Sequence, residues 1–279
     1  MKIVETFSDL SKHRLAFSGE VALIPTMGAL HEGHLALIRL AKSHAKHTIV
    51  SIFVNPTQFG PNEDFESYPR SRTKDLMQLE KVGVDIVFFP TTQEVYPNGI
   101  HEATRIYVPT IGHLYCGKSR PTFFEGVCSI VLRLFLITKP THAVFGEKDF
   151  QQVTIIKKMI TDLYLNIKII QAPIVREDDG LAMSSRNQYL SEAERQLATE
   201  IYNTLIKLQK TPQNSNIAAA IQKEVCELER NGIRVDYLSL VEEGSLREIT
   251  KPTPNSRVLF AGYIGKTRLI DNMPLTQTD

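Results

Sequence analysis

The most constraining feature of the sequence is a regular alternation of short apolar segments with longer amphipathic ones between residues 21 and 173. The apolar segments, rich in β-branched residues, are typical of buried strands: 21–25, 48–55, 84–90, 141–146 and 167–173. The segments between them have apolar residues at helical spacing: 34–47, 71–83, 125–139 and 149–164. Such alternation predicts an α/β fold, a Rossmann-like parallel sheet with helices on both faces.

The pattern changes after about residue 175. Two successive helices are predicted at 191–210 and 216–232, separated by a short polar linker. Three segments with the alternation of strands follow them: 234–242, 257–265 and 267–272. We therefore expect two domains, a Rossmann-like domain over residues 1–174 and a smaller C-terminal α+β domain over residues 175–279.

Composition narrows the possible partners and the compartment. The formal net charge of +1 gives no global field for nucleic acid or an anionic membrane, so any phosphate site must be local. The N-terminus lacks the apolar core of a secretory signal, and the longest apolar segment is too short to span a bilayer. The three cysteines have no paired spacing, which favours a reduced cytoplasmic protein.

The stretch PTMGALHEGH, residues 25–34, joins the first predicted strand to the first predicted helix. Gly28 allows a close backbone approach to a ligand, and Gly33 and His34 open a helix whose free N–H groups favour an anion. His31 and His34 are spaced to face one ligand and to donate to phosphate oxygens. The same residues also fit a capped helix with two incidental histidines or, less well, part of a zinc site.

Two further strand ends carry polar residues. Asn55 and Gln58 follow the strand at 48–55, and their amides suit an orienting role. Lys148 follows the strand at 141–146 and can neutralise phosphate charge, while Asp149 can cap the next helix or contact ribose or metal. Because ligands bind beyond the carboxyl ends of parallel strands, we expect these turns to converge on one site.

The HEGH motif resembles the H-x-G-H signature of the nucleotidyltransferase superfamily, which includes the class I aminoacyl-tRNA synthetases. The longer string IPTMGALHEGHLALI is similar to the pantoate–β-alanine ligase family. The resemblance continues through FVNPTQF, EDFESYPR, FGEKDFQQ, REDDGLAMSSRN and GKTRLIDN, and so covers nearly the whole chain in order.

This resemblance implies an ATP-dependent condensation of pantoate with β-alanine to pantothenate, through a pantoyl adenylate, with release of AMP and pyrophosphate. ATP would enter with Mg²⁺, for which we assign no protein ligand, and the C-terminal domain would cover the site. Since the family is commonly dimeric, a homodimer is expected. Cationic and hydrogen-bonding groups should outnumber acid–base pairs, because a carboxylate nucleophile needs alignment and charge neutralisation rather than a strong base.

The family pattern also assigns residues. By resemblance His34 is the proton donor, and His31, Lys148 and Arg186 complete the catalytic set. The ATP site would comprise Met27, Gly28, His31, Gly33, His34, Gly146, Glu147, Lys148, Asp149, Val175, Met183, Ser184, Ser185 and Arg186. Gln58 and Gln152 match contacts to pantoate, with Gln58 also near the path of β-alanine. Asn55 and Arg120 are further candidates for substrate binding.

One segment departs from the family pattern. Where the family usually reads R-P-G-H-F, this chain reads RPTFF, with Thr122 and Phe123 in place of the glycine and the histidine. We expect a change in loop flexibility and the loss of one polar contact, with the reaction retained.

Two other functions are compatible with parts of the sequence. A related nucleotidyltransferase could make a dinucleotide or a CDP-type product, although the Gln58 and Gln152 segments argue against it. A non-catalytic metal or regulatory module could use the histidine pair alone. Pantoate-dependent exchange between ATP and pyrophosphate, and tightly bound stoichiometric zinc, would distinguish the three.

Overall fold

The computed structural model describes residues 1–61, 63–211 and 216–275. Its larger sheet has six parallel strands in the order β1-β4-β3-β2-β5-β6. The strands are β1 (Lys2–Val4), β2 (Val21–Thr26), β3 (His47–Ile52), β4 (Ile86–Phe88), β5 (His142–Gly146) and β6 (Lys168–Ala172). The expected parallel sheet is therefore confirmed, with one additional edge strand, β1, that the sequence analysis missed.

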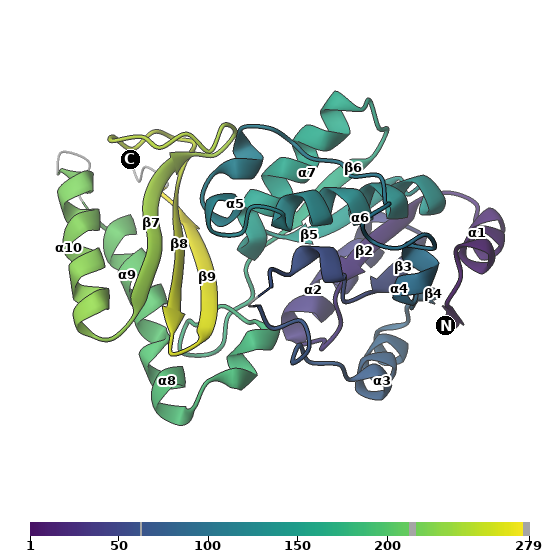
Figure 1. Cartoon of the computed structure of the whole chain (residues 1–279), viewed down its shortest axis with the longest axis horizontal. Coiled ribbons are helices and arrows are strands. Elements are labelled where there is room, and N and C mark those ends of the chain that lie inside the picture. The colour runs from purple at the N-terminus through teal and green to yellow at the C-terminus, as the bar shows by residue number, and fades with distance from the viewer. Residues whose placement is uncertain (62, 212–215, 276–279) are drawn as a thin grey trace.

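Helices cover both faces of this sheet (Figure 1). Alternate residues of each strand point to opposite faces, so that Leu23 packs into one apolar core and Ile24 into the other. One face is covered by α2 (Glu32–His44) and α3 (Arg72–Val82), the other by α1 (Phe7–Leu15), α6 (Phe123–Thr138) and α7 (Phe150–Asp162). The short helices α4 (Thr92–Val95) and α5 (Cys116–Ser119) lie in connections. Among the described helices, none has the length and apolar character needed to cross a membrane.

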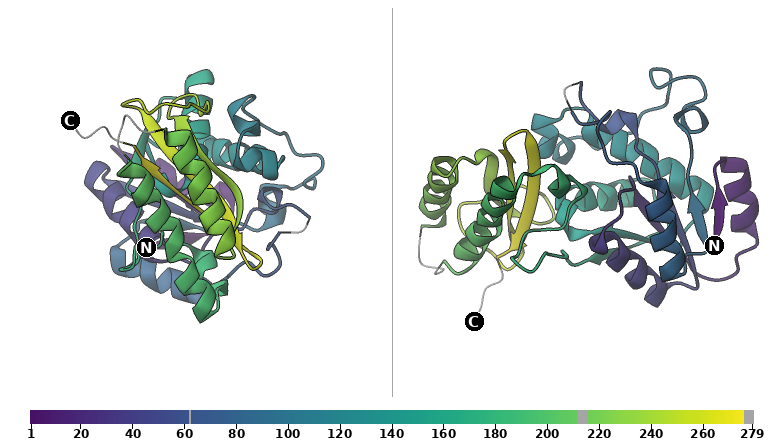
Figure 2. Two further views of the ribbon diagram at one scale, coloured as in Figure 1. Left: turned by 90° about the vertical axis from the view of Figure 1, so that its left-hand side faces the viewer. Right: turned by 90° about the horizontal axis from the view of Figure 1, so that it is seen from below.

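The C-terminal part is built on a three-stranded antiparallel sheet in the order β7-β8-β9, at one end of the molecule (Figure 2). Its elements are α8 (Glu192–Leu197), α9 (Thr199–Gln209), α10 (Ile217–Arg230), β7 (Arg234–Glu242), β8 (Ser256–Ile264) and β9 (Thr267–Pro274). The α+β character and the three strands agree with expectation. The helix expected at 191–210 is interrupted at buried Ala198, whose carbonyl accepts the i+3 bond from Ile201.

The strand order places the ligand-binding edge. From β2 the chain moves outward through β3 to β4, and it later returns to the opposite side of β2 with β5 and β6. The carboxyl ends of β2 and β5 are therefore neighbours at the point where the winding direction reverses. In open α/β sheets, this is the position where ligands bind.

Candidate active site

A cavity of about 960 Å³ opens beyond the carboxyl ends of β2 and β5, between the two sheets. Most of the residues expected in the site line it: Met27, His31, Gly33, His34, Gln58, Arg120, Gly146, Lys148, Asp149, Gln152, Val175, Met183, Ser184, Ser185 and Arg186. Gly28, Asn55 and Glu147 were expected to contact ligands, but they lie behind this lining. Each of these three residues supports a neighbour that does line the cavity.

The turn after β2 is held from behind by a carboxylate of α3. Gly28 has φ 84° and Ala29 has φ 50°, so both occupy the left-handed region that favours glycine. The backbone N–H groups of Ala29 and Leu30 donate to buried Asp75, at 3.0 and 2.9 Å. Gly28 thus contributes the conformation of the turn, and the neighbouring N–H groups bind Asp75 rather than a ligand.

The two histidines lie side by side at the start of α2. His31 occupies the N-cap position, and its ring centroid lies 4.0 Å from that of His34. The backbone N–H of His31 donates to Nδ1 of His34 at 3.3 Å. A Cβ atom at Gly33 would lie 2.9 Å from the His31 ring, so a larger residue here would displace that ring. Because Nδ1 of neutral His34 accepts, its proton resides on Nε2.

Burial keeps both imidazoles neutral in the ligand-free protein. Desolvation, with His31 and Lys148 nearby, lowers the pKa of His34 well below its usual value. Desolvation also lowers the pKa of His31, to about 4, with a further contribution from Lys148. The site therefore presents neutral hydrogen-bond donors beside a lysine, an arrangement suited to an anion.

Lys148 lies on a turn that the C-terminal sheet supports. The turn is a 3₁₀ segment, Glu147–Asp149, that joins β5 to α7. Nδ2 of Asn272, on β9, donates to the carbonyl oxygens of Glu147 and Lys148, at 2.9 and 3.0 Å. Glu147 therefore serves the site through its backbone. Asp149 stands at the N-cap of α7, but its side chain makes no capping bond within the described residues, so the capping role considered for it is not observed.

The amide side chains near η1 (Pro56–Gln58) and α7 are of two kinds. Those of Asn55 and Gln151 bond other protein groups, and those of Gln58 and Gln152 line the cavity. Asn55 is fully buried and donates to Oε1 of Gln58 at 3.1 Å, while its own Oδ1 accepts from Tyr96 at 2.8 Å. Its role is therefore to orient Gln58, whose Nε2 group has no hydrogen-bond partner among the residues that the structure describes. Gln151 bonds three backbone groups of the 111–116 connection. Adjacent Gln152 lines the cavity instead.

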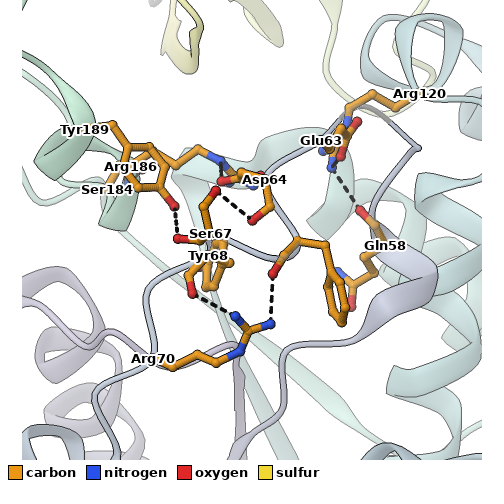
Figure 3. A network of polar contacts seen from close by, with 11 residues as sticks. Gln58, Glu63, Asp64, Ser67, Tyr68, Arg70, Arg120, Ser184, Arg186 and Tyr189 are labelled. Carbon is orange, nitrogen blue, oxygen red and sulfur yellow. Dashed lines mark hydrogen bonds and ion pairs between the residues drawn. The ribbon is translucent and has the colours of Figure 1, made fainter.

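The segment 183–186 closes the cavity from the C-terminal side. Ser185 donates to the carbonyl of Ala29 at 3.1 Å, which joins this segment to the turn after β2. The hydroxyl of Ser184 accepts from the N–H of Arg186 at 3.3 Å. The Arg186 guanidinium makes a bidentate contact with Asp64 (Figure 3).

Arg120 is held in a similar way beside Gln58. Its Nε and Nη2 atoms donate to Glu63 at 2.6 and 2.5 Å, and Nη2 also donates to the carbonyl of Gln58 at 2.9 Å. The guanidinium carbon lies 3.8 Å from the ring centroid of Phe123. The phenyl ring that replaces the usual histidine therefore forms a cation–π contact with a cavity arginine.

Sequence reasoning missed the supporting residues Glu63, Asp64, Asp75 and Asn272. Asp75 lay inside a predicted helix with no local sign of its task. The other three belong to EDFESYPR and GKTRLIDN, segments that carried the family resemblance but received no role. Among the residues that the structure describes, in this cavity or outside it, no group of three His, Cys, Asp or Glu side chains is placed so that it could hold a metal ion.

Comparisons with known proteins identify the family of this chain. Residues 2–274 match the family model described as pantoate-beta-alanine ligase. The pantothenate synthetase of Thermosipho africanus is 41% identical over 98% of this chain and 99% of its own. The pantoate–β-alanine ligase of Schizosaccharomyces pombe is 47% identical over 92% and 91%.

Solved structures give the same result. The crystal structure of pantothenate synthetase from Thermus thermophilus has a TM-score of 0.94 and 39% identity, covering 99% of this chain and all of the other. A pantoate–β-alanine ligase from Francisella tularensis, complexed with beta-gamma ATP and β-alanine, has a TM-score of 0.84 and 36% identity. It covers 100% of this chain and 99% of its own. The chain therefore belongs to the pantoate–β-alanine ligase family.

Proposed function

We propose that the protein condenses pantoate with β-alanine to pantothenate at the expense of ATP, releasing AMP and pyrophosphate. The observation that carries this proposal is the cavity at the switch point of the sheet. Neutral histidines, Lys148 and Arg186 lie together there, and the two glutamines line the same space. The Francisella tularensis ligase, complexed with beta-gamma ATP and β-alanine, supports the choice of substrates.

In the first step, an oxygen of the pantoate carboxylate bonds to the α-phosphorus of ATP, and the bond from that phosphorus to pyrophosphate breaks. We assign the triphosphate to the first turn of α2, Lys148 and the segment 183–186. The Nε2–H of His34 donates to an oxygen on which negative charge develops, and Lys148 and Arg186 neutralise the leaving pyrophosphate. ATP enters as its Mg²⁺ complex, so that the metal arrives with the substrate.

In the second step, the β-alanine amine attacks the acyl carbon of the pantoyl adenylate. A carbon–nitrogen bond forms, the bond to AMP breaks and the amine loses a proton. Gln58 and Gln152 offer amide groups that match the hydroxyls and carboxylate of pantoate without adding charge. Gln58 Nε2, which has no partner in the described part of the chain, and Arg120, which bonds the Gln58 carbonyl, suit binding of the pantoate and β-alanine carboxylates.

The test is formation of AMP from ATP, pantoate and β-alanine, with each compound omitted in turn. AMP should accumulate only when all three are present. Exchange of labelled pyrophosphate into ATP should require pantoate and proceed without β-alanine. Exchange without pantoate would point to a different nucleotidyl acceptor and would contradict the proposal.

The domain boundary, assembly and compartment are part of the same proposal. We place the boundary at residues 174–175, because many buried apolar residues between Leu181 and Leu275 form a core of their own.

We propose a homodimer on the family resemblance, to be tested by light scattering. The free thiols of Cys116, Cys128 and Cys226 support a reducing cytoplasmic location, which fractionation would test.

A further inference from the structure

Two neighbouring carboxylates, Glu63 and Asp64, hold two different arginines of the cavity (Figure 3). Asp64 accepts from Nε and Nη2 of Arg186 at 2.9 and 2.8 Å, and Glu63 accepts from the same two atoms of Arg120. All four side chains line the cavity and are at most 25% exposed. Parallel bonds of this kind fix both the position and the plane of a guanidinium.

Both pairs leave the same edge of the arginine free. A guanidinium has five N–H groups, of which Asp64 uses two of Arg186. Glu63 and the Gln58 carbonyl together use three of Arg120. Within the described part of the chain, Nη1 of neither arginine has a hydrogen-bond partner. The carboxylates therefore orient the arginines without consuming the donors that an anion needs.

The two arginines adjoin different parts of the cavity lining. Arg186 follows Ser185, whose hydroxyl bonds Ala29 in the turn that leads to the histidines. Arg120 instead bonds the backbone of Gln58. The Arg186–Asp64 pair thus lies near the proposed site of the ATP phosphates, and the Arg120–Glu63 pair lies near the proposed site of the pantoate and β-alanine carboxylates.

The segment that carries the carboxylates, here called the 63–70 strap, is braced independently of these pairs. The guanidinium of Arg70 donates to the carbonyl oxygens of Phe65, Glu66 and Tyr68. The hydroxyl of Tyr189 donates to the carbonyl of Ser67 at 3.1 Å. Removing one carboxylate charge should therefore leave the path of the strap unchanged.

We propose that Glu63 and Asp64 are positioning residues, which aim the free edge of Arg120 at a substrate carboxylate and that of Arg186 at the phosphates of ATP. The inference rests on the proposed function, because it takes its ligands from it. It adds that two adjacent residues govern the binding of different substrates.

The experiment measures KM for ATP, pantoate and β-alanine, together with kcat, in the variants D64N and E63Q of the full chain. D64N should raise KM for ATP about tenfold or more and leave both acid KM values within about twofold. E63Q should leave KM for ATP unchanged and raise KM for pantoate or for β-alanine. Varying each acid separately shows which of the two substrates Arg120 binds. E66Q is the matched control, since Glu66 lies exposed on the same strap, and it should behave as the wild type.

Three outcomes would overturn the inference. A lower KM for ATP in D64N would mean that Asp64 competes with phosphate for Arg186. A parallel change of all three KM values in both variants would mean that the carboxylates only stiffen the strap. Unchanged KM values in both variants would show that the two arginines keep their orientation without these carboxylates.

Two additional variants make the result independent of simple unfolding. If D64N does not fold, D64E keeps the charge but displaces the guanidinium by one methylene, and it should show the same loss specific to ATP. In an R186K background, where bidentate geometry is already lost, D64N should add little further loss. Failure of the proposed function is distinct, because the wild type itself would then form no AMP.

Discussion

At the scale of single residues, the proposed chemistry depends on imidazoles that burial keeps neutral. The pKa of His34 lies well below its usual value because the ring is desolvated beside His31 and Lys148. Since Nδ1 accepts from the backbone, the Nε2–H group is a donor fixed before any ligand arrives. A preorganised neutral donor stabilises developing charge without reorganisation during the reaction.

Replacing His34 by alanine should slow pantoate-dependent exchange of pyrophosphate into ATP by roughly 100-fold or more, because this donor is lost. The melting temperature should change little. His44→Ala is the control, since His44 lies exposed at the other end of the same helix. Full exchange activity in His34→Ala would remove this side chain from the chemical step.

The depressed pKa of His31 predicts a dependence of stability on pH. Burial lowers this pKa from 6.5 to about 4 in the folded protein, so below about pH 6.5 the unfolded chain binds a proton that the folded chain does not. The contribution of neutral His31 to the free energy of unfolding is therefore complete above about pH 6.5, and it is lost as the pH falls toward 4. The melting temperature of ligand-free His31→Gln should therefore decrease less between about pH 7 and pH 5 than that of the wild type. Parallel decreases would contradict this assignment.

Individual residues also show what the sequence could and could not predict. His31, His34 and Lys148 were found because they follow strands whose apolar pattern is local and whose motifs match a family. Asp75 and Asn272 were missed because their partners lie 45 or more and 124 or more residues away in the chain. No local pattern encodes such contacts, which exist only after the sheet has formed.

At the scale of elements, the same distinction explains the fold. Strand β2 is a largely apolar run between two neighbours, so its sequence alone identifies it. Strand β1 has three residues at the sheet edge and pairs only with β4 among the described strands, so it has no comparable signal. Likewise, the position of η1 (Pro56–Gln58) depends on how closely α6 can approach it.

Gly126 permits that approach, which makes it a test of how α6 supports Gln58. A Cβ atom at residue 126 would lie 2.4 Å from the carbonyl oxygen of Thr57. Gly126→Ala should therefore cost about 1–3 kcal/mol of unfolding free energy, by chemical denaturation, and raise KM for pantoate. Gly244→Ala is the matched control, since no atom of the described residues lies within 4 Å of the added carbon. Equal stability of the two variants would show that α6 shifts without cost.

At the scale of the whole molecule, the cavity depends on contacts between the two sheets. Asp271, buried on β9, accepts two bonds from Arg176 in the connection that follows β6. The adjacent Asn272 reaches the turn after β5, and Arg257 donates to its Oδ1 at 2.5 Å. The smaller sheet therefore does more than line the cavity, because it fixes the backbone on which Lys148 stands.

This coupling predicts that Asn272→Ala weakens ATP binding although its side chain acts through the backbone. The carbonyl oxygens of Glu147 and Lys148 would lose their donors, and we expect a loss of about 1–2 kcal/mol of unfolding free energy. The Lys148 turn should loosen, so KM for ATP should rise more than KM for pantoate, and amide exchange should increase at residues 146–150. Asn203→Ala, exposed on α9, is the control and should change none of these quantities. If Asn272→Ala raised both KM values equally while amide exchange at the turn stayed constant, the Lys148 turn would keep its structure without the Asn272 bonds. The two sheets would then line the cavity without supporting each other.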